Sequence, residues 1–208
     1  MSGAVLVKIC GLRDETIIDH AIAAGADAIG LNLVEGSPRA IPLLRARQLA
    51  AHVAGRALVV AVVVNPSPTE LGRLLGEARF DFLQLHGDER LPSDARTLAR
   101  LWKAVRLQSP DQLEAIVALP VASVLVDAAS SRGLGGTGER ADWILAAALA
   151  ARRPSWLAGG LTPDNVAAAI AAVHPFGVDV ASGIERAPGV PDPDKVAAFV
   201  RAAKGQGT

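Results

Sequence analysis

The chain has 208 residues, with 21 basic and 21 acidic side chains and a formal net charge of zero. This length can bury a large core in one domain, and a single cysteine excludes an intrachain disulfide. The charges are scattered rather than gathered in a basic stripe, so we expect no nucleic-acid partner. Four dispersed histidines show no metal-ligand spacing, so we expect no metal ion.

The N-terminal segment MSGAVLVKIC lacks the features of a secretory signal, which are a basic segment, an apolar run and a small-residue cleavage site. No apolar stretch approaches the roughly 20 residues that a membrane-spanning helix needs. We therefore expect a soluble, cytoplasmic protein that does not contact a membrane.

Short apolar runs alternate with longer segments of helical period along the chain. Apolar residues fill nearly every position of the short runs, which is typical of parallel strands covered by helices. In chain order, the pattern predicts strand 4–10, helix 14–24, strand 28–33, helix 42–53, strand 57–64, helix 68–78, strand 81–85, helix 92–100, strand 102–107, helix 110–118, strand 121–127, helix 141–151, strand 155–158, helix 163–173, strand 177–181 and helix 193–203.

Several residues mark the ends of these helices. Ser67, Ser109 and Thr162 each precede a proline, so each is predicted to cap a helix whose first residue is that proline. Gly25 and Gly55 lie just past helix ends, where a positive φ is useful.

Eight strand–helix units in this length, at about 26 residues each, predict a single (β/α)8 TIM barrel domain over residues 1–208. A doubly wound open sheet is the alternative fold. Such a sheet usually carries G-x-G-x-x-G after its first strand, and the segment CGLRDE does not match it. In barrels of this kind the chemistry lies at the C-terminal ends of the strands, so those ends hold the candidate site residues.

Glycines follow the seventh and eighth predicted strands, where barrels commonly bind a phosphate. Gly159 and Gly160 allow backbone N–H groups to approach an anion closely, and Ser182 and Gly183 add a hydroxyl and a second bare backbone. Either loop alone could be an ordinary turn. Because both lie in neighbouring units, the sequence favours a phosphate site.

Two charged residues also lie at strand ends. Asp127 closes an apolar run, where a carboxylate is costly unless it caps, pairs or reacts. The glycine-rich stretch 133–138 after it is interpreted as a mobile cover. Arg39 lies in an irregular loop after the second strand, and its guanidinium suits a substrate carboxylate, although a loop arginine is often only solvated.

The first strand ends at Cys10, which by itself is interpreted as a small buried hydrophobe. Lys8 shares a face of this strand with Cys10, because strand side chains alternate. If Cys10 lies at the barrel mouth, Lys8 lies deeper inside and should pair with a carboxylate. A Schiff base at Lys8 or Lys103 is an open alternative.

Ten short motifs occur along the chain in an order that is found in one protein family. They are KICG (8–11), GADAIG (25–30), SPR (37–39), VVVN (62–65), QLHGDE (84–89), VDA (126–128), GGTG (135–138), DW (142–143), LAGGLTPDNV (157–166) and GVDVASGIE (177–185). Over essentially the whole chain they resemble the phosphoribosylanthranilate isomerase family, (β/α)8 enzymes of tryptophan biosynthesis.

The resemblance implies an Amadori rearrangement of N-(5-phosphoribosyl)anthranilate to 1-(2-carboxyphenylamino)-1-deoxyribulose 5-phosphate. The enzyme would be an intramolecular oxidoreductase that needs no cofactor, takes a small phosphorylated substrate and acts as a monomer or homodimer. By motif, Cys10 is implied as general base, Asp127 as general acid, Arg39 as partner of the anthranilate carboxylate and Asp179 as a substrate-binding residue. The phosphate-binding set implied by the resemblance is Gly159, Gly160, Ser182 and Gly183.

This chemistry needs one group protonated and the other ionised beside the same sugar. We therefore expect a local field that lowers the pKa of Cys10, together with burial and a nearby phosphate that keep Asp127 protonated. The alternatives are another phosphosugar barrel that forms a Schiff base, such as a lyase or aldolase, and a non-catalytic barrel that binds a phosphorylated ligand.

The chain also departs from the family pattern. It has Leu31, Asn32 and Leu33 where the family usually has phenylalanines, and Gly36 and Ala40 flank the SPR segment. These changes predict altered packing around the anthranilate ring but no change in reaction type.

Overall fold

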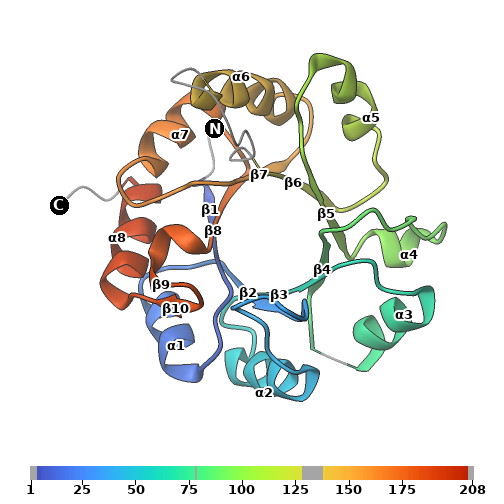
Figure 1. Ribbon diagram of the computed structural model, residues 1–208, viewed down its shortest axis with the longest axis vertical. Coiled ribbons are helices and arrows are strands. Elements are labelled where there is room, and N and C mark those ends of the chain that lie inside the picture. The colour runs from blue at the N-terminus through green and yellow to red at the C-terminus, as the bar shows by residue number, and fades with distance from the viewer. Residues whose placement is uncertain (1–3, 78, 128–137, 206–208) are drawn as a thin grey trace.

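The computed structural model describes residues 4–77, 79–127 and 138–205. In this part of the chain, strands β1 to β8 run parallel and close into a barrel in sequence order, with helices outside it (Figure 1). β1 pairs with β2 on one side and with β8 on the other, so the sheet has no open edge. The predicted (β/α)8 barrel is confirmed, and the open doubly wound sheet is wrong.

The strands of the barrel are β1 (Leu6–Cys10), β2 (Ala28–Asn32), β3 (Leu58–Val63), β4 (Phe82–Leu85), β5 (Leu101–Val105), β6 (Ser123–Asp127), β7 (Ser155–Ala158) and β8 (Gly177–Val180). The helices are α1 (Glu15–Ala23), α2 (Leu43–Val53), α3 (Pro68–Glu77), α4 (Ala95–Leu98), α5 (Leu113–Val117), α6 (Gly138–Ala150), α7 (Val166–Val173) and α8 (Pro193–Ala203). Each lies within or close to its predicted range, and α4 is much shorter than the predicted helix 92–100.

Two of the predicted helix starts are confirmed. The hydroxyl oxygen of Ser67 accepts a hydrogen bond from the backbone N–H of Glu70 at 3.2 Å, and α3 begins at the next residue, Pro68. After Ser109 the chain forms the 3-10 turn η1 (Pro110–Gln112), which leads into α5. Gly25 and Gly55 have φ values of 102° and 77°, as predicted for glycines that follow helices.

The predicted start of the seventh helix is wrong. α7 begins at Val166 rather than at Pro163. The side chain of Asn165 closes a separate turn first, because its Oδ1 accepts from the N–H of Thr162 at 2.8 Å and its Nδ2 donates to the carbonyl of Gly160 at 2.9 Å. The side chain of Asn165, three residues after Thr162, therefore closes this turn, and the helix begins only at the next residue.

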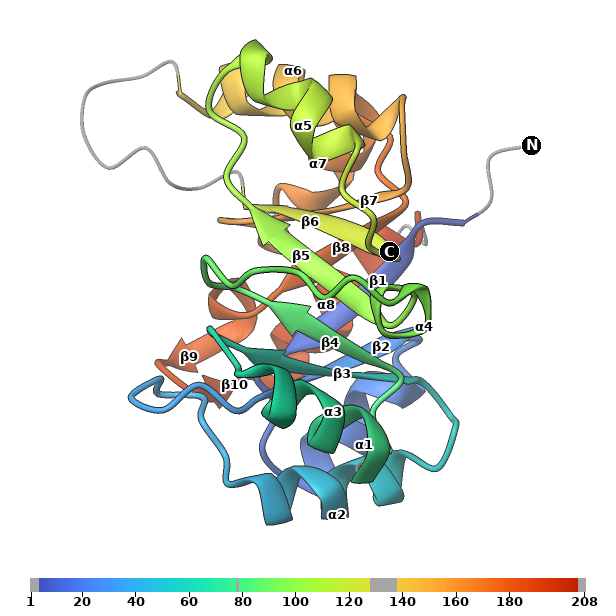
Figure 2. The ribbon, with the colours of Figure 1, turned by 90° about the vertical axis from the view of Figure 1, so that its right-hand side faces the viewer.

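A small hairpin was not predicted from the sequence. After β8 the chain makes the 3-10 turn η2 (Ser182–Ile184) and then two short antiparallel strands, β9 (Glu185–Ala187) and β10 (Val190–Pro191). Figure 2 shows this hairpin on the side of the barrel toward which the strand arrowheads of β4 and β5 point. It therefore lies at the C-terminal end of the barrel. In the sequence it comes between β8 and α8, but in space it lies close to the loop after β2, as the contacts described below show.

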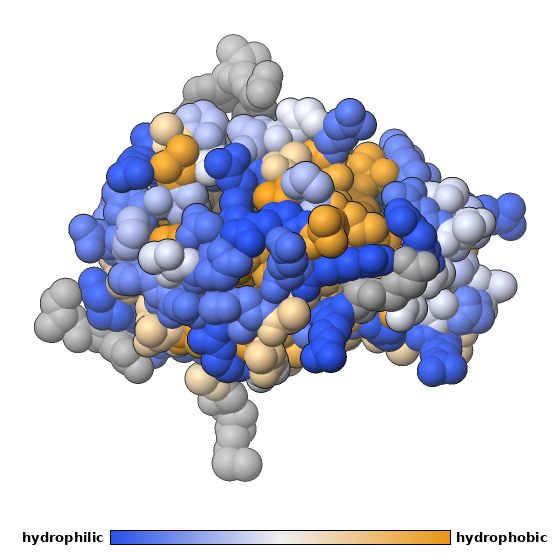
Figure 3. Space-filling model, turned by 90° about the horizontal axis from the view of Figure 1, so that it is seen from below, coloured by the Kyte–Doolittle hydropathy of each residue, from blue (hydrophilic) through white to orange (hydrophobic). Residues whose placement is uncertain are grey.

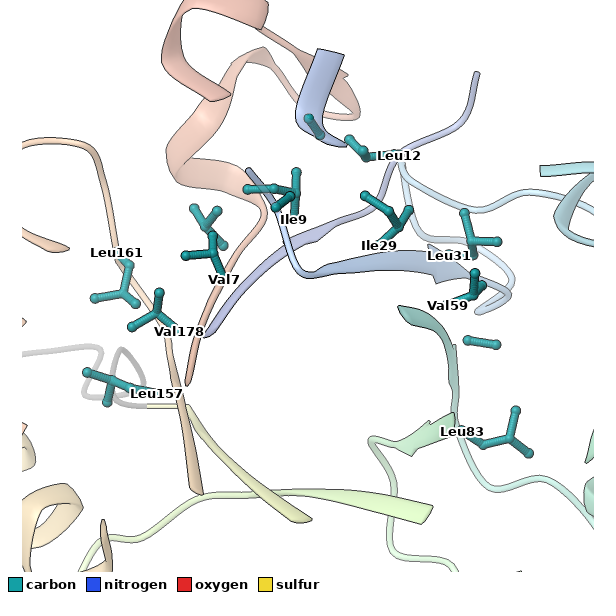
Figure 4. Packing of buried hydrophobic residues seen from close by; sticks show 14 of the residues in the cluster. Val7, Ile9, Leu12, Ile29, Leu31, Val59, Leu83, Leu157, Leu161 and Val178 are labelled. Carbon is teal, nitrogen blue, oxygen red and sulfur yellow. The ribbon is translucent and has the colours of Figure 1, made fainter. Parts of the chain in front are cut away.

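Apolar side chains form two layers, one on each face of the barrel wall. The outer layer joins strands to helices, and Figure 4 shows Val7, Ile9, Ile29, Leu83 and Val178 among side chains that point away from the barrel interior. The inner layer includes Val60, Leu125 and two stacked indoles, Trp102 and Trp156, whose ring centroids lie 4.6 Å apart. Each large side chain so buried contributes about 1.5–3 kcal/mol to the free energy of unfolding.

The alternation along β1 decides which of its residues reach the site. Val7 and Ile9 point outward into the helical layer, so Lys8 and Cys10 point into the barrel. Among the described residues, no helix combines the length and apolar character needed to span a membrane.

Candidate active site

A cavity of about 260 Å³ lies where the C-terminal ends of the strands meet. Its lining includes every residue that the sequence predicts for the site: Cys10, Arg39, Asp127, Gly159, Gly160, Asp179, Ser182 and Gly183. These residues come from β1, β6, β8 and the loops after β2, β7 and β8, so closure of the barrel brings them together. No bulge or rearrangement is needed, because parallel strands all present their C-terminal ends to the same side.

Cys10 is the last residue of β1 and is only 9% exposed. Its neighbour in register on β2 is Gly30, and a Cβ atom placed on that glycine would lie 2.6 Å from the Cys10 Sγ. Side-chain contacts this short do not occur in real proteins. Gly30 therefore makes the room in which the thiol sits, at the inner edge of the cavity.

Lys8 lies one layer below Cys10 and is completely buried. Its Nζ donates to Oδ1 of Asp179 at 2.9 Å and to Oε1 of Gln84 at 3.0 Å. The predicted pairing of Lys8 with a carboxylate inside the barrel is confirmed. Burial alone would lower the pKa of Lys8, but the Asp179 carboxylate and the neighbouring Cys10 outweigh it and raise the pKa above its ordinary value.

This state of Lys8 bears on the Schiff-base alternative. A Schiff base requires a neutral amine that a substrate carbonyl can reach, whereas Lys8 is fully buried and its pKa is raised. The other candidate, Lys103, donates to the carboxylate of Glu89 and to the carbonyl of Gly87. Neither amine has the environment that such chemistry needs.

The expected lowering of the pKa of Cys10 is wrong. Burial raises the pKa of this thiol above its ordinary value, because a thiolate loses the solvation of water there. The ammonium of Lys8 and, more weakly, the guanidinium of Arg39 act in the opposite direction, while the carboxylate of Asp179 adds to the rise. The burial of Cys10 therefore favours its thiol form over the thiolate.

Asp127 is the last residue of β6 and is half-buried at the cavity rim. The glycine-rich stretch after it was predicted to be a mobile cover, but residues 133–137 of that stretch lie outside the described residues. A larger groove of about 580 Å³ adjoins the cavity and shares Asp127 and His86 with it. Among the described residues, the cavity and the groove therefore meet at Asp127 and His86.

Three polar residues of the lining were missed in the sequence. Asn32 ends β2, Gln84 lies within β4, and His86 follows the end of β4. Partial burial lowers the pKa of His86, although the nearby carboxylates of Asp127 and Asp179 act against the shift. The strand-end rule that singled out Asp127 applies equally to Asn32 and His86 and could have identified both.

Arg39 reaches the cavity from the loop after β2, but it already holds a carboxylate of the protein. Its Nε and Nη2 donate to the two carboxylate oxygens of Glu185, each at 2.7 Å. The backbone N–H of Arg39 donates to the hydroxyl of Ser37, which also accepts from Nδ2 of Asn32. The predicted arginine is thus in place, with a partner on the β9–β10 hairpin that the sequence did not indicate.

The glycine loops after β7 and β8 have the geometry of an anion site. Gly159 and Gly160 have φ values of 85° and 64°, in the left-handed region that favours glycine. Within the described ranges, the N–H groups of Gly160 and Gly183 donate no hydrogen bond to other backbone atoms. A Cβ atom on Gly183 would overlap the carbonyl oxygen of Leu161, so the two loops touch backbone to backbone.

This close approach gives a first testable prediction. Gly183→Ala should lower the free energy of unfolding by about 1–3 kcal/mol, because the added methyl group must push apart two backbone segments. If these loops bind a phosphate, as the sequence predicts, the change should also raise KM more than it lowers kcat, because the separated loops would hold the phosphate less tightly. Urea unfolding and steady-state kinetics measure the two effects.

The matched control is Gly72→Ala, on the exposed side of α3 where a Cβ atom meets nothing within 4 Å. There the change should stabilise the helix by roughly 0.5–1 kcal/mol or be neutral. Equal behaviour of the two variants would mean that the loops after β7 and β8 do not need their close contact.

A second hollow on the molecule has a different character. Figure 3 shows hydrophobic side chains gathered on the face seen from below, beside α2, and a groove of about 670 Å³ lies there between α2 and α3. It is lined mostly by apolar residues, including Leu33 and Val64, and contains none of the predicted site residues. The second strand has Leu31 and Asn32, and Leu33 follows it, where phenylalanines were expected from the family pattern. Among the described residues, the lining of the 260 Å³ cavity contains no Phe, Tyr or Trp.

Comparison with known proteins gives a consistent result. A family model for N-(5'-phosphoribosyl)anthranilate (PRA) isomerase matches residues 7–202. The N-(5'-phosphoribosyl)anthranilate isomerase of Pseudomonas fluorescens is 44% identical over 204 residues, covering 97% of this chain and 96% of the relative.

Solved structures of high coverage agree. The phosphoribosyl anthranilate isomerase of Thermotoga maritima superposes with a TM-score of 0.85 at 33% identity, covering 97% of this chain and 99% of that one. A structure of the isomerase in complex with reduced 1-(o-carboxyphenylamino)-1-deoxyribulose 5-phosphate has a TM-score of 0.83 at 31% identity, with coverage of 97% and 99%. A 2-keto-3-deoxy-6-phosphogluconate aldolase from Zymomonas mobilis, at 19% identity and a TM-score of 0.65, shares the fold alone.

The barrel, the cavity at its C-terminal end that holds the predicted site residues and these matches over nearly the full length lead to one assignment. The resemblance inferred from the motifs is confirmed, and the chain belongs to the N-(5'-phosphoribosyl)anthranilate isomerase family.

Proposed function

We propose that Cys10 and Asp127 carry out the isomerisation of N-(5'-phosphoribosyl)anthranilate in this chain as general base and general acid. Arg39 binds the carboxylate of the anthranilate, and the loops after β7 and β8 bind the phosphate. The observation that carries this proposal is one cavity of about 260 Å³, whose lining unites a thiol, two carboxylates, an arginine and two glycine loops.

The chemistry is an internal redox exchange that balances without a cofactor. Asp127 gives a proton to the ring oxygen as the C1′–O bond breaks, and the nitrogen lone pair forms an iminium at C1′. The thiolate of Cys10 then takes the proton from C2′, and the electron pair of that C–H bond forms the enolamine. Tautomerisation to the ketone leaves C2′ oxidised and C1′ reduced. Positioned acids and bases of this kind each contribute about 10²- to 10⁴-fold in rate.

Binding at both ends of the substrate orients the sugar between the two groups. The phosphate would lie at Gly160 and Gly183, and the carboxylate at Arg39 on the side of β2. Two charged anchors fix the position of a flexible sugar, so that C2′ and the ring oxygen stay within reach of Cys10 and Asp127.

Lys8 affects the base without touching the substrate. The reaction starts from the fraction of molecules in which Cys10 is ionised and Asp127 is protonated. The Lys8 ammonium stabilises the thiolate, and its pairing with Asp179 and Gln84 keeps it in place. Asp179 is thereby proposed to support the site from below, as well as to line the cavity.

Turnover by the purified chain tests the proposal, followed through the change in anthranilate fluorescence. Asp127→Asn should lower kcat/KM by about 10²-fold or more, because the amide cannot protonate the ring oxygen. The control is Asp88→Asn, at an exposed carboxylate on the neighbouring groove, which should leave kcat/KM within about twofold. An Asp127→Asn enzyme as active as the control would remove Asp127 from the mechanism.

The titration of Cys10 gives a separate test. Its thiol should ionise at a pH above the ordinary range of cysteine, because burial outweighs the effect of Lys8. Cys10 is the sole cysteine and the chain has no tyrosine, so the ultraviolet difference between wild type and Cys10→Ser follows this one thiolate.

The raised pKa of Cys10 also affects how the stability of the protein depends on pH. Because the folded state holds the thiol proton more tightly than the unfolded chain does, the free energy of unfolding should fall as pH rises from the ordinary cysteine pKa through the raised pKa of Cys10. A thiolate midpoint at or below the ordinary value would show that Lys8, rather than burial, dominates the environment of Cys10.

For assembly, we infer that residues 1–208 act as one barrel domain, as a monomer or a homodimer. A relative from Thermotoga maritima is described as dimeric, and monomers generated from it have been solved. Sedimentation velocity on the purified chain distinguishes the two states.

A further inference from the structure

The ion pair between Arg39 and Glu185 joins two segments that are 146 residues apart in the chain. Both side chains are largely enclosed, with 21% of the arginine and 6% of the glutamate side chain exposed. We propose that Glu185 is a positioning residue for substrate recognition, which holds one edge of Arg39 so that its remaining N–H groups meet the substrate carboxylate. This inference rests on the proposed role of Arg39.

Glu185 itself is held firmly by the β9–β10 hairpin. It pairs with Pro191 across the hairpin, and its carbonyl accepts from Nζ of Lys195 at 3.0 Å. The next residue back, Ile184, accepts from the N–H of Asp192 at 2.8 Å. The carboxylate thus projects from a short strand whose two sides are both anchored, and it cannot swing away without leaving its enclosed position.

The loop that carries Arg39 is held from two further sides. A Cβ atom on Gly11, which has a φ of 83°, would lie 2.5 Å from Cδ of Arg39, so the arginine stem lies directly over a bare stretch of backbone. Gly189, at the tip of the hairpin, likewise lies against the carbonyl of Pro38, which also accepts from Nη1 of Arg13 at 3.0 Å. The hairpin and the end of β1 together fix both the backbone and the stem of Arg39.

The donor count of a guanidinium explains why this arrangement leaves Arg39 able to bind a ligand. Arginine carries five N–H donors in a rigid plane, and Glu185 uses two of them, one on Nε and one on Nη2. Within the described residues, Nη1 makes no hydrogen bond. Because the plane is rigid, fixing one edge also fixes the direction of the free edge, so little further ordering is needed when a carboxylate binds.

The same contacts allow an opposite interpretation, and the two interpretations predict opposite changes in carboxylate binding when Glu185 is removed. If Glu185 instead competed with the substrate for Arg39, its removal would release the arginine and strengthen binding of the carboxylate. If it positions Arg39, its removal loosens the arginine and weakens that binding. The enclosed carboxylate and the anchored hairpin favour positioning, because a competitor must be able to move aside.

The test compares two substrates on the same protein. One is N-(5-phosphoribosyl)anthranilate, and the other is its aniline counterpart, which lacks only the carboxylate; both form from ribose 5-phosphate and the free amine. The ratio of their kcat/KM values measures recognition of the carboxylate. Since both substrates meet the same preparation, a variant that folds only in part changes both values equally and leaves the ratio unaffected.

We expect a ratio on the order of 100 for the wild type, the size of effect that a close charge pair in a partly buried site produces. Glu185→Gln should lower this ratio by about tenfold, because its amide N–H₂ faces the N–H groups of Arg39 and only one oxygen remains to accept. Arg39→Met should lower the ratio to near one. The double variant should match Arg39→Met, because Glu185 acts through Arg39.

The outcomes separate this inference from the proposed function. An unchanged ratio in Arg39→Met would overturn the role of Arg39 itself. A collapsed ratio in Arg39→Met together with an unchanged or higher ratio in Glu185→Gln would overturn only the positioning role. The control is Glu15→Gln, which breaks another bidentate pair, with Nη1 and Nη2 of Arg45, between α1 and α2, and should leave the ratio unchanged.

Discussion

Cys10→Ser is expected to lower kcat/KM by about 10⁴-fold, at the upper end of what a general base contributes. The serine hydroxyl ionises far less readily than a thiol, so no base remains at the end of β1. Water cannot replace this base easily, because the proton to be removed is bonded to carbon and the position of Cys10 is buried, with only 9% of the residue exposed. Protonation of the ring oxygen is more easily assisted by solvent, so the loss at Asp127 should be smaller.

Two measurements make this result specific. The substitution preserves the side-chain volume closely, so the free energy of unfolding, measured in urea, should change by less than about 1.5 kcal/mol. Alkylation by iodoacetamide should inactivate the wild type at the rate at which it modifies its one thiol, and substrate should protect against it. A Cys10→Ser enzyme that retains a tenth of the wild-type kcat/KM would exclude the thiol as the base.

Lys8→Met should lower the free energy of unfolding by about 3–5 kcal/mol, because it leaves the carboxylate of Asp179 buried without its cation. Methionine fills most of the lysine volume, so the loss comes from the charge rather than from an empty space. Equilibrium urea unfolding measures it. The double variant Lys8→Met/Asp179→Asn should recover a substantial part of the loss, because an uncharged amide costs less to bury than a lone carboxylate.

The control for this experiment is Lys204→Met. Lys204 forms an ion pair of 2.6 Å with Asp27, but both side chains are partly exposed, at 17% and 31%. Pairs in water contribute about 1 kcal/mol or less. If Lys8→Met destabilised the protein no more than Lys204→Met, the interior pair would not contribute to stability as its burial indicates.

The strands of the barrel could be predicted because each is covered by helices outside and by side chains inside. Runs such as Leu58–Val63 are therefore apolar at every position, and this pattern needs no knowledge of partners. Once the barrel is predicted, the strand-end rule places Cys10 and Asp127 at one end. The predicted site residues followed from the fold and from the motifs, and the structure places them around one cavity.

What could not be predicted depends on contacts between segments distant in the chain. The pair Arg39–Glu185 requires the hairpin after β8, and the short strands of that hairpin contain Pro191 and few apolar residues. The delayed start of α7 depends on one side chain, Asn165, that competes with the helix for a backbone group. The raised pKa of Cys10 arises because burial of the thiol outweighs the opposing effect of the Lys8 ammonium, a balance that no local pattern reveals.

The pairing of β1 with β8 has a consequence for how the protein forms during synthesis. Lys8 of β1 and Asp179 of β8 face each other in register where these strands pair, 171 residues apart in the chain. The charge of Lys8 is therefore neutralised only when the last strand pairs with the first. Until then the emerging chain has no carboxylate partner for Lys8 inside the sheet, and an open sheet edge lies beside its one thiol. The ribosome-bound chain should therefore stay susceptible to thiol-directed probes until nearly all of it has emerged, and completing the ring should protect the thiol.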